Sequence, residues 1–373
     1  MKSTITNEAI TNDSALALLN SRRDFLKKLG GGVIVAFTVG KLSILDGWAN
    51  NPEVAMLNFN AYLRVKEDGR VDCYTGKIEM GQGVGTSLAQ AVAEELEVSI
   101  YTIDMVMGDT ELCPYDDGTW GSMTTRFADP VLRAAAAEAR IILIGLAAEQ
   151  LKVAPALLEV KEGVVYVKND PSRKISYAAL TKGQKIIQTL KDKPALKKAK
   201  DLKVVGTSIV RLDAEAKVTG KAKYTGDIKL PGMVYASIVR PSVFGSKKIS
   251  VHASELVGFE GAQLIEDGNL VAVVHSNSEI AYAAAQKIQV SWEAPELKVD
   301  QETIFKHLEN TIKDSRIHQE GGNLATGQTL SETIIEGDYL DGYKAHASIE
   351  THCATCFFEG DKLTMWASTQ SPF

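Results

Sequence analysis

Apolar residues alternate with polar ones from Ala55 to Val65, and a second apolar run follows at Val71 to Tyr74. Alternation is the period of a half-buried strand, and the Asp68-Gly69 pair between the two runs is a turn signal. The sequence therefore predicts a β-hairpin here. A further strand is expected between Ile100 and Gly108, and two short strands should flank the turn at Glu162-Gly163.

Other stretches repeat their apolar residues at helical spacing, which predicts a helix from about Ser87 to Val98 and a long one from Arg133 to Lys152. A strand, a helix and a second strand are expected in turn between Leu270 and Trp292, and a further helix between Val299 and Ser315. Residues 318–329 are glycine-rich and predict a loop. This mixture of elements is that of an α+β protein.

A glycine turn, Gly81-Gln82-Gly83-Val84-Gly85-Thr86, separates a strand-like run from the first predicted helix. Glycine adopts backbone angles that other residues avoid, and the first amides of a helix have no partner inside the helix. A turn of this kind can hold an anion such as a phosphate group. The same pattern also suits a simple tight connection.

The first fifty residues differ from the rest. Arg22-Arg23 precedes a short apolar run, Leu29 to Leu45, which contains three consecutive glycines and Lys41. Paired arginines before a weakly hydrophobic segment are typical of a twin-arginine export signal, so we expect export of the folded protein to the periplasm, with residues 1–50 outside the fold. A helical hairpin or a membrane anchor is the alternative reading, although the run is short for a membrane span.

Composition narrows the function classes. The chain has 373 residues, 45% of them hydrophobic and 24% charged, which is enough for two or three packed cores. The formal net charge of -6 gives no attraction for nucleic acid. Lysines gather between residues 182 and 203, where a solvated connector is expected.

The four cysteines, Cys73, Cys113, Cys353 and Cys356, lack the spacing that would hold an iron–sulfur cluster. The last two have C-x-x-C spacing and could, with two nearby histidines, bind zinc or act as a redox pair. They fall in a strand-like segment, where residues three apart point to opposite faces. We therefore expect no metal ligand among the side chains, and keep a zinc or thiol protein as an alternative.

Four segments together resemble the molybdenum-binding subunit of the xanthine dehydrogenase and aldehyde oxidase family, in particular its isoquinoline 1-oxidoreductase type. They read EMGQGVGT, then GTWGSMTT, then LDAEAKVTGKAKYTGDIKLPGMVYASIVRP, and finally HASIETHCAT followed by WASTQSPF. Their order along the chain is that of the family.

The resemblance implies an α+β fold in which an α/β hammerhead domain is inserted between portions of a molybdopterin-binding domain. The expected segments are a twin-arginine signal at 1–50, an N-terminal molybdopterin-binding portion at 51–205, the hammerhead domain at 206–325, and the truncated start of a second molybdopterin-binding domain at 326–373.

The resemblance also implies site residues. The family loop whose amides hold the pyrophosphate of molybdopterin cytosine dinucleotide is matched by Gly81, Gln82, Gly83 and Thr86. Hydroxyl positions that contact the same cofactor are matched by Ser122 and Thr124, with Thr125 as a substitute, and the glutamine beside the molybdenum by Gln370, the one catalytic candidate. Hydroxyls and amides suit a phosphate because they donate hydrogen bonds without adding buried charge. Any one of these hydroxyls could instead cap a helix or close a turn.

The activity implied is that of a molybdopterin-dependent oxidoreductase that oxidises an aldehyde or an N-heteroaromatic carbon with water as the oxygen source. Electrons would pass to a small subunit with [2Fe–2S] clusters and then to a cytochrome c. No residue here matches the family's GGGFG-type loop or its catalytic glutamate, so we expect an N-terminal half whose remainder lies on a longer chain or a second polypeptide. A catalytically incomplete half and a non-catalytic periplasmic scaffold remain alternatives.

Overall fold

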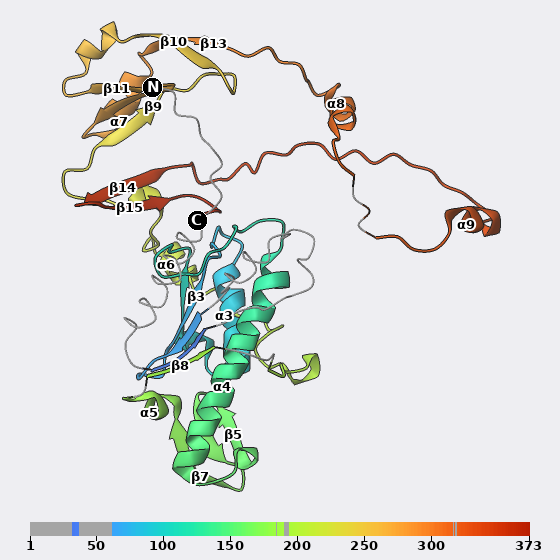
Figure 1. The fold of residues 1–373 in the computed structure, drawn as a ribbon. Coiled ribbons are helices and arrows are strands. Elements are labelled where there is room, and N and C mark those ends of the chain that lie inside the picture. The colour runs from blue at the N-terminus through green and yellow to red at the C-terminus, as the bar shows by residue number, and fades with distance from the viewer. Residues whose placement is uncertain (1–31, 37–61, 184, 190–193, 316, 318) are drawn as a thin grey trace. The chain divides into compact units, whose positions relative to one another are not determined.

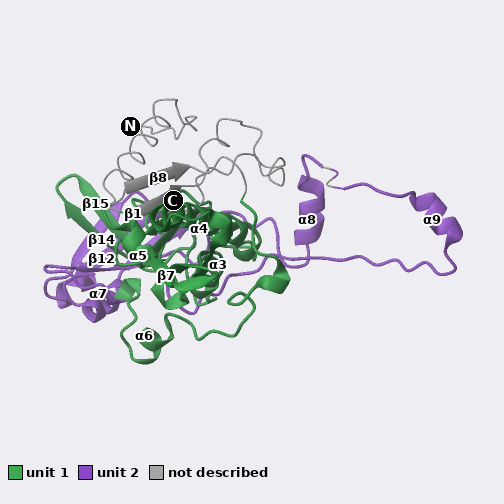
Figure 2. Ribbon diagram, turned by 90° about the horizontal axis from the view of Figure 1, so that it is seen from below, with its two compact units in different colours: residues 1–226, 352–373 green, residues 227–351 purple. Residues whose placement is uncertain are grey.

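The computed structural model describes residues 32–36, 62–183, 185–189, 194–315, 317 and 319–373. These residues form a mixed α and β protein with several small sheets (Figure 1). They divide into two compact units (Figure 2). Unit 1 takes the chain up to Gly226 together with His352–Phe373, and unit 2 is Asp227–Thr351.

The largest sheet of unit 1 has five strands in the order β4-β3-β2-β1-β8. Strands β2 (Tyr62–Val65) and β3 (Val71–Thr75) pair antiparallel, with Leu63 opposite Cys73, and β4 (Ile103–Met107) runs parallel to β3. The predicted hairpin and the strand after it are therefore confirmed over these residues. The earlier part of the first predicted strand, residues 55–61, lies outside the described residues.

Strand β1 (Gly32–Ala36) comes from the N-terminal segment that was expected to take no part in the fold. It pairs antiparallel with β2 and parallel with β8 (Lys185–Thr189). Its sequence, GVIVA, is rich in β-branched residues, which favour strands. The expectation that all of residues 1–50 lie outside the fold is thus wrong for these five residues, while the paired arginines lie outside the described part of the chain.

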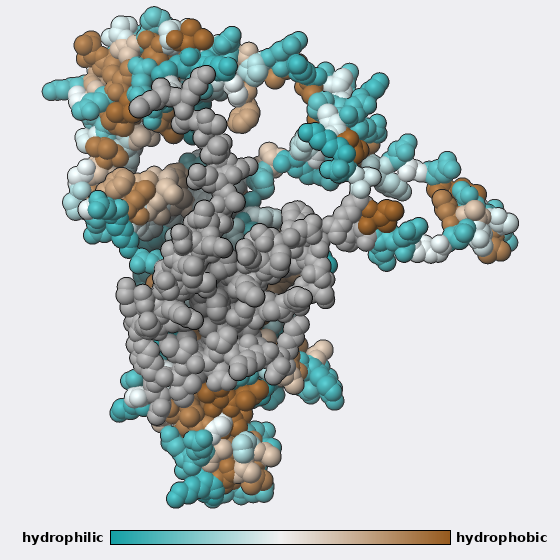
Figure 3. Space-filling model, in the orientation of Figure 1, coloured by the Kyte–Doolittle hydropathy of each residue, from teal (hydrophilic) through white to brown (hydrophobic). Residues whose placement is uncertain are grey.

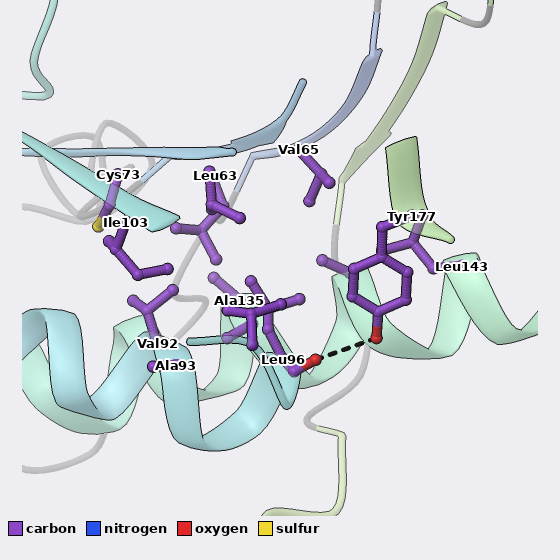
Figure 4. Close-up of a cluster of buried hydrophobic side chains, with 14 of the residues drawn as sticks. Leu63, Val65, Cys73, Val92, Ala93, Leu96, Ile103, Ala135, Leu143 and Tyr177 are labelled. Carbon is purple, nitrogen blue, oxygen red and sulfur yellow. Dashed lines mark hydrogen bonds between the residues drawn. The ribbon is translucent and has the colours of Figure 1, made fainter. Parts of the chain in front are cut away.

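Two long helices, α3 (Val84–Leu96) and α4 (Asp129–Leu151), pack on each other and against this sheet. Figure 4 shows side chains from the strands, among them Leu63 and Cys73, directed towards Val92 and Leu96 of α3. Tyr177, at the start of α5 (Tyr177–Thr181), is buried and donates its hydroxyl to the carbonyl of Leu96 at 3.0 Å. That bond satisfies one of the carbonyls left unpaired at the end of α3.

The lysine-rich connector is anchored to α3 rather than simply solvated, which corrects the sequence expectation. Buried Glu94 accepts hydrogen bonds from the amides of Lys203 and Val204 at 2.8 and 2.6 Å, and from Lys197 Nζ at 3.1 Å. Its neighbour Glu95, also buried, pairs with Arg133 at 2.6 Å. Because a buried carboxylate needs partners, these contacts fix the path of the connector after its least regular part.

Two smaller sheets complete unit 1. Strands β5 (Leu158–Lys161), β6 (Val164–Val167) and β7 (Asp170–Ser176) form one, with the predicted turn at Glu162-Gly163. The other is a hairpin of β14 (Ala354–Glu359) and β15 (Lys362–Ala367). The short helices are η1 (Ile100–Thr102), η2 (Thr124–Ala128), η3 (Pro155–Leu157), η4 (Ala199–Asp201), α6 (Ala214–Val218) and η5 (Thr225–Asp227).

Unit 2 has two small sheets, β11-β12-β9 and β10-β13, with helix α7 against the first. The strands are β9 (Tyr235–Ile238), β10 (Lys247–His252), β11 (Gln263–Asp267), β12 (Leu270–His275) and β13 (Gln289–Glu293). The helices are η6 (Ser254–Gly258), α7 (Ser278–Ala285), α8 (Ile304–Thr311) and α9 (Leu324–Leu330). The predicted succession of strand, helix and strand at β12, α7 and β13 is confirmed, but the two strands belong to different sheets.

Residues 318–329 were predicted to be a loop, and α9 shows that this is wrong from Leu324 onwards. The side chain of Asn323 accepts a hydrogen bond from the amide of Thr326 at 2.9 Å and so caps the helix. Leu324 and Leu330 are exposed, and α9 carries hydrophobic surface at the right of Figure 3. None of the helices described is both long and apolar enough to span a bilayer.

The core contact between α4 and the sheet can be tested with two substitutions on one helix. Leu143 is 0% exposed and Ile141 is 51% exposed. We expect Leu143→Ala to lower the free energy of unfolding by about 2–5 kcal/mol, because it leaves a cavity. Ile141→Ala should cost less than about 1 kcal/mol. Urea unfolding of both variants checks this, and equal losses would contradict the packing described.

The anchoring of the connector predicts a pH dependence. Burial works against ionisation of Glu94, but the amides of residues 203–205 and Lys197 outweigh it and hold the pKa of Glu94 below its ordinary value of 4.5. A depressed pKa contributes stability above about pH 4.5 that is lost as the pH falls through the folded-state pKa. Glu94→Gln should therefore unfold more easily at pH 7, by about 2–3 kcal/mol, and lose less stability than wild type on acidification.

The control is Glu149→Gln, which changes an exposed glutamate at the end of α4. Its stability should follow wild type across the pH range. If Glu94→Gln showed the same acid profile as wild type, the carboxylate would not be the group that holds the connector.

Candidate functional site

A cavity of about 420 Å³ in unit 1 brings together four of the residues predicted from sequence, Gln82, Ser122, Thr124 and Thr125. The full lining consists of Met80, Gln82, Val84, Ser87, Thr119, Trp120, Gly121, Ser122, Thr124 and Thr125. Two segments about forty residues apart in the chain therefore form one wall each. No side chain in this lining is charged.

The cavity lies where two helices begin. Helix α3 starts at Val84, and the π-helical turn η2, which starts at Thr124, runs directly into α4. The first amides of a helix are unpaired within it, and the helix dipole makes that end positive. A neutral wall of hydroxyl and amide groups beside two helix starts suits a phosphate group better than a cation.

A second cavity of about 420 Å³ lies towards the other end of α3. Its lining contains Glu94, Glu97, Glu159 and Glu162, together with three lysines, and none of the residues predicted from sequence. Four carboxylates make this second cavity a poor host for a phosphate.

The loop that supplies the hydroxyls has an unusual backbone. Ser122 has a φ of 56°, in the left-handed region that non-glycine residues rarely adopt, and Gly121 has a φ of 62°. Such backbone persists only where its surroundings hold it. Here the amide of Ile78 donates to Thr119 Oγ1 at 2.9 Å, and Lys77 Nζ donates to the carbonyl of Gly118 at 2.8 Å. Both contacts join this loop to the chain just before the glycine turn.

Gln370, the catalytic candidate, lies beside the same loop. Its carbonyl accepts a hydrogen bond from the amide of Thr119 at 2.9 Å, and the rings of Phe373 and Tyr115 are in contact with centroids 5.6 Å apart. The C-terminal hairpin thus brings Gln370 next to a residue of the cavity wall. The Gln370 side chain is not part of the lining itself.

The glycine turn does not present all of its amides to the cavity. The amides of Gly81 and Gly83 donate to Oε1 of Glu79 at 2.8 and 2.9 Å, and the amide of Gly85 donates to Oε2 at 3.0 Å. The sequence placed Glu79 among the surface, helix or strand residues without a role. Its position four residues before the N-terminal cap of α3 was the signal available.

Thr86 also differs from expectation. It is buried, it is absent from the cavity lining, and its hydroxyl accepts a hydrogen bond from the amide of Leu212 at 3.0 Å. Thr86 therefore secures the chain that follows the connector to the start of α3. Of the eight predicted site residues, Gly81, Gly83 and Thr86 make internal contacts in this structure, four others line the cavity, and Gln370 lies next to it.

The cysteines occupy different surroundings. Cys73 and Cys113 are buried, and burial raises the pKa of the Cys113 thiol to about 11. Cys356 lies in β14 opposite Met365, and Cys353 precedes that strand. Within the described residues, no three or more His, Cys, Asp and Glu side chains are grouped so that they could hold a metal ion.

Comparison with known proteins places the chain in a family. A family model for the molybdopterin cofactor-binding domain matches residues 12–229, more than half of the sequence. The chain belongs to this family. It is related to the molybdenum-binding subunits of the xanthine dehydrogenase family, which confirms the resemblance found in the four sequence segments.

Several curated proteins are similar to this molybdopterin-binding chain. A nicotinate dehydrogenase subunit from Pseudomonas putida is 30% identical over 331 residues, which are 86% of this chain and 28% of that protein. The isoquinoline 1-oxidoreductase beta subunit from Brevundimonas diminuta is 28% identical over 74% of this chain and 40% of that protein. The chain therefore spans less than half the length of either relative.

Among solved structures, CO dehydrogenase from Oligotropha carboxidovorans is 24% identical, with a TM-score of 0.32. The match covers 45% of this chain and 22% of that one.

The glycine turn yields a test with a matched pair of substitutions. Gly83 has a φ of 84°, whereas Gly85 has no positive φ and a Cβ there would stand 3.6 Å from its nearest neighbours, Glu79 Oε2 and Met107 Sδ. We expect Gly83→Ala to lower the free energy of unfolding by about 1–2 kcal/mol through backbone strain. Gly85→Ala should be neutral or slightly stabilising, because alanine favours a helix. Thermal unfolding compares the two, and an equal effect would contradict the described turn.

Proposed function

We propose that this chain is the cofactor-holding part of a molybdenum hydroxylase that oxidises an aldehyde or an N-heteroaromatic carbon, with water as the oxygen source. The observation that carries the proposal is the convergence of Gln82, Ser122, Thr124 and Thr125 on one neutral cavity at two helix starts. It occurs in a chain that belongs to the molybdopterin cofactor-binding domain family.

The cavity fits the phosphate-bearing part of a pterin dinucleotide. Its polar groups are hydroxyls and a carboxamide, which donate hydrogen bonds to phosphate oxygens without bringing a buried charge. Trp120 adds an aromatic face on which a flat ring can stack. We infer that the dinucleotide is the cytosine form, as in the family type whose sequence segments this chain shares.

When bound, the molybdenum centre supplies two-electron redox chemistry. The residues of this chain bind and orient: Gln82 and the hydroxyls at 122, 124 and 125 hold the dinucleotide, and the loop around Thr119 fixes Gln370 beside it. Orientation of this kind converts binding energy into rate. Gln370 is the catalytic candidate because its backbone is tied to the cavity wall.

The proposal includes partners. Two of the relatives are named as subunits, and their names refer to nicotinate and isoquinoline, both N-heteroaromatic. The inferred partners are a small subunit with [2Fe–2S] clusters, a cytochrome c as electron acceptor, and the polypeptide that carries the remaining length of the relatives. These partners receive the electrons and complete the substrate pocket.

The finer fold and location belong to the same proposal. The chain leaves unit 1 at Gly226 and returns to it at His352, which supports an inserted domain. We infer that this insertion is the α/β hammerhead domain, expected from sequence at 206–325. We also infer export of the folded protein to the periplasm through the paired arginines Arg22-Arg23, with a membrane anchor where the signal is retained.

The test is the cofactor content of the full chain, expressed and purified with its small subunit. We expect stoichiometric molybdenum by mass spectrometry and release of a cytidine nucleotide on acid treatment. Absence of both from the wild-type complex would overturn the proposed function.

Two variants test the assigned residues within the same experiment. Gln82→Ala and Thr124→Val each remove a hydrogen-bonding group from the cavity and should retain the cofactor about tenfold less well. Thr110→Val is the control, because Thr110 is exposed and outside the lining. Equal cofactor content in all of them would show that the cavity is not where the dinucleotide binds.

A further inference from the structure

One carboxylate takes three amides of the glycine turn. Glu79 Oε1 accepts from Gly81 and Gly83, and Oε2 accepts from Gly85, at 2.8 to 3.0 Å. Gly83 is the N-terminal cap of α3 and Gly85 lies in its first turn. A carboxylate here occupies the place at a helix start where a bound phosphate would otherwise accept hydrogen bonds.

Arg211 holds this carboxylate from the other side. Its Nη2 lies 3.3 Å from Glu79 Oε1, and its Nη1 donates to the carbonyl of Gly81 at 2.6 Å. Arg211 is itself paired with Asp213 at 2.7 Å. Hydrogen bonds between ionised groups are shorter and stronger than neutral ones, so the carboxylate, the guanidinium and the turn form one rigid group.

The turn has two sides. Residues 79, 81, 83 and 85 share the Glu79 contacts, whereas Met80, Gln82 and Val84 line the cavity. Gln82 is fixed on its side because its Oε1 accepts from the amide of Met80 at 2.6 Å and its Nε2 donates to the carbonyl of Ile78 at 2.9 Å. The amides bound by Glu79 and the groups in the cavity wall therefore alternate along the turn.

We propose that Glu79 is a built-in anion of the glycine turn. Its carboxylate fills the amide cradle of Gly81, Gly83 and Gly85 and stays there, which directs Gln82 and Ser87 towards the cavity. The incoming dinucleotide then meets the cavity side of the turn and not these three amides. The first statement concerns this chain alone, and the second rests on the proposed function. Glu79 is a positioning residue in this scheme.

The rival arrangement is displacement, in which a phosphate drives the carboxylate out and takes the three amides itself. The two differ in what happens when Glu79 is removed. With a resident carboxylate, Glu79→Ala opens an anion site that wild type lacks, because three amides and Arg211 are left without their acceptor. With displacement, wild type already uses that site.

The experiment follows ¹⁵N-glycine signals of the full chain during titration with inorganic pyrophosphate. Gly81, Gly83 and Gly85 report on the amide cradle, and Gly121 reports on the cavity. In wild type we expect the three cradle signals to stay in place at concentrations that shift Gly121. In Glu79→Ala we expect the cradle signals to differ before any addition and then to shift with pyrophosphate, with at least tenfold tighter binding than any cradle response in wild type.

A second variant guards against misfolding of the first. Glu79→Gln keeps the length of the side chain but only one acceptor oxygen, so part of the cradle should lose its partner while the rest is unchanged. Glu149→Ala, on the exposed end of α4, should behave as wild type.

Cradle signals that shift in wild type as strongly as in Glu79→Ala would overturn the proposal in favour of displacement. Cradle signals that are the same in wild type and both Glu79 variants would show that the carboxylate does not hold these amides. A silent Gly121 beside the expected cradle behaviour counts against the proposed cofactor site alone, so the two failures are distinguishable.

Discussion

Burial of helix α3 along most of its length is the constraint on which unit 1 depends. A helix enclosed by a sheet, a second helix and a connector cannot leave its polar ends or its two internal glutamates to water. The protein supplies a partner for each: Glu79 at the first amides, Tyr177 at the carbonyl of Leu96, and backbone or basic groups at Glu94 and Glu95. Loss of any one partner leaves a polar group buried and unpaired.

Because those partners come from distant parts of the chain, α3 also organises the rest of the unit. The connector reaches it through Lys197 and the amides near Val204, and the segment after the connector reaches it through Leu212 and Arg211. The cavity sits at the end of the helix that these contacts hold in place. Its lining belongs to unit 1 throughout, so its form does not depend on the small separate core of unit 2.

Much of the local structure could be predicted because it is written in short periods. The alternation in β2 and β3, the helical spacing in α3 and α4, and the turn at Glu162-Gly163 are properties of neighbouring residues. The meeting of Gln82 with Ser122 and Thr124 was expected only because the family resemblance joined two distant motifs. Position in a motif, however, does not give the direction in which an amide or a hydroxyl points.

The misses share that physical cause. Whether Gly81 donates into the cavity or to Glu79, and whether Thr86 faces a ligand or the amide of Leu212, depends on contacts made only in the folded chain. The same holds for Lys197, which by its neighbours belongs to a solvated run but pairs with a buried carboxylate. The strand β1 was missed because its pairing depends on partners far along the sequence.

The hydrogen bond from Thr119 to the carbonyl of Gln370 bears on the order of assembly during synthesis. Thr119 leaves the ribosome some 250 residues before Gln370, so the loop with Ser122 and Thr124 waits for its last backbone partner until the C-terminal hairpin has formed. Contacts of such long sequence separation form late because closing a large loop costs entropy. A nascent chain in this state has the scaffold of α3 and α4 but an unfinished cavity wall, which places any loading of the cavity after translation of this hairpin.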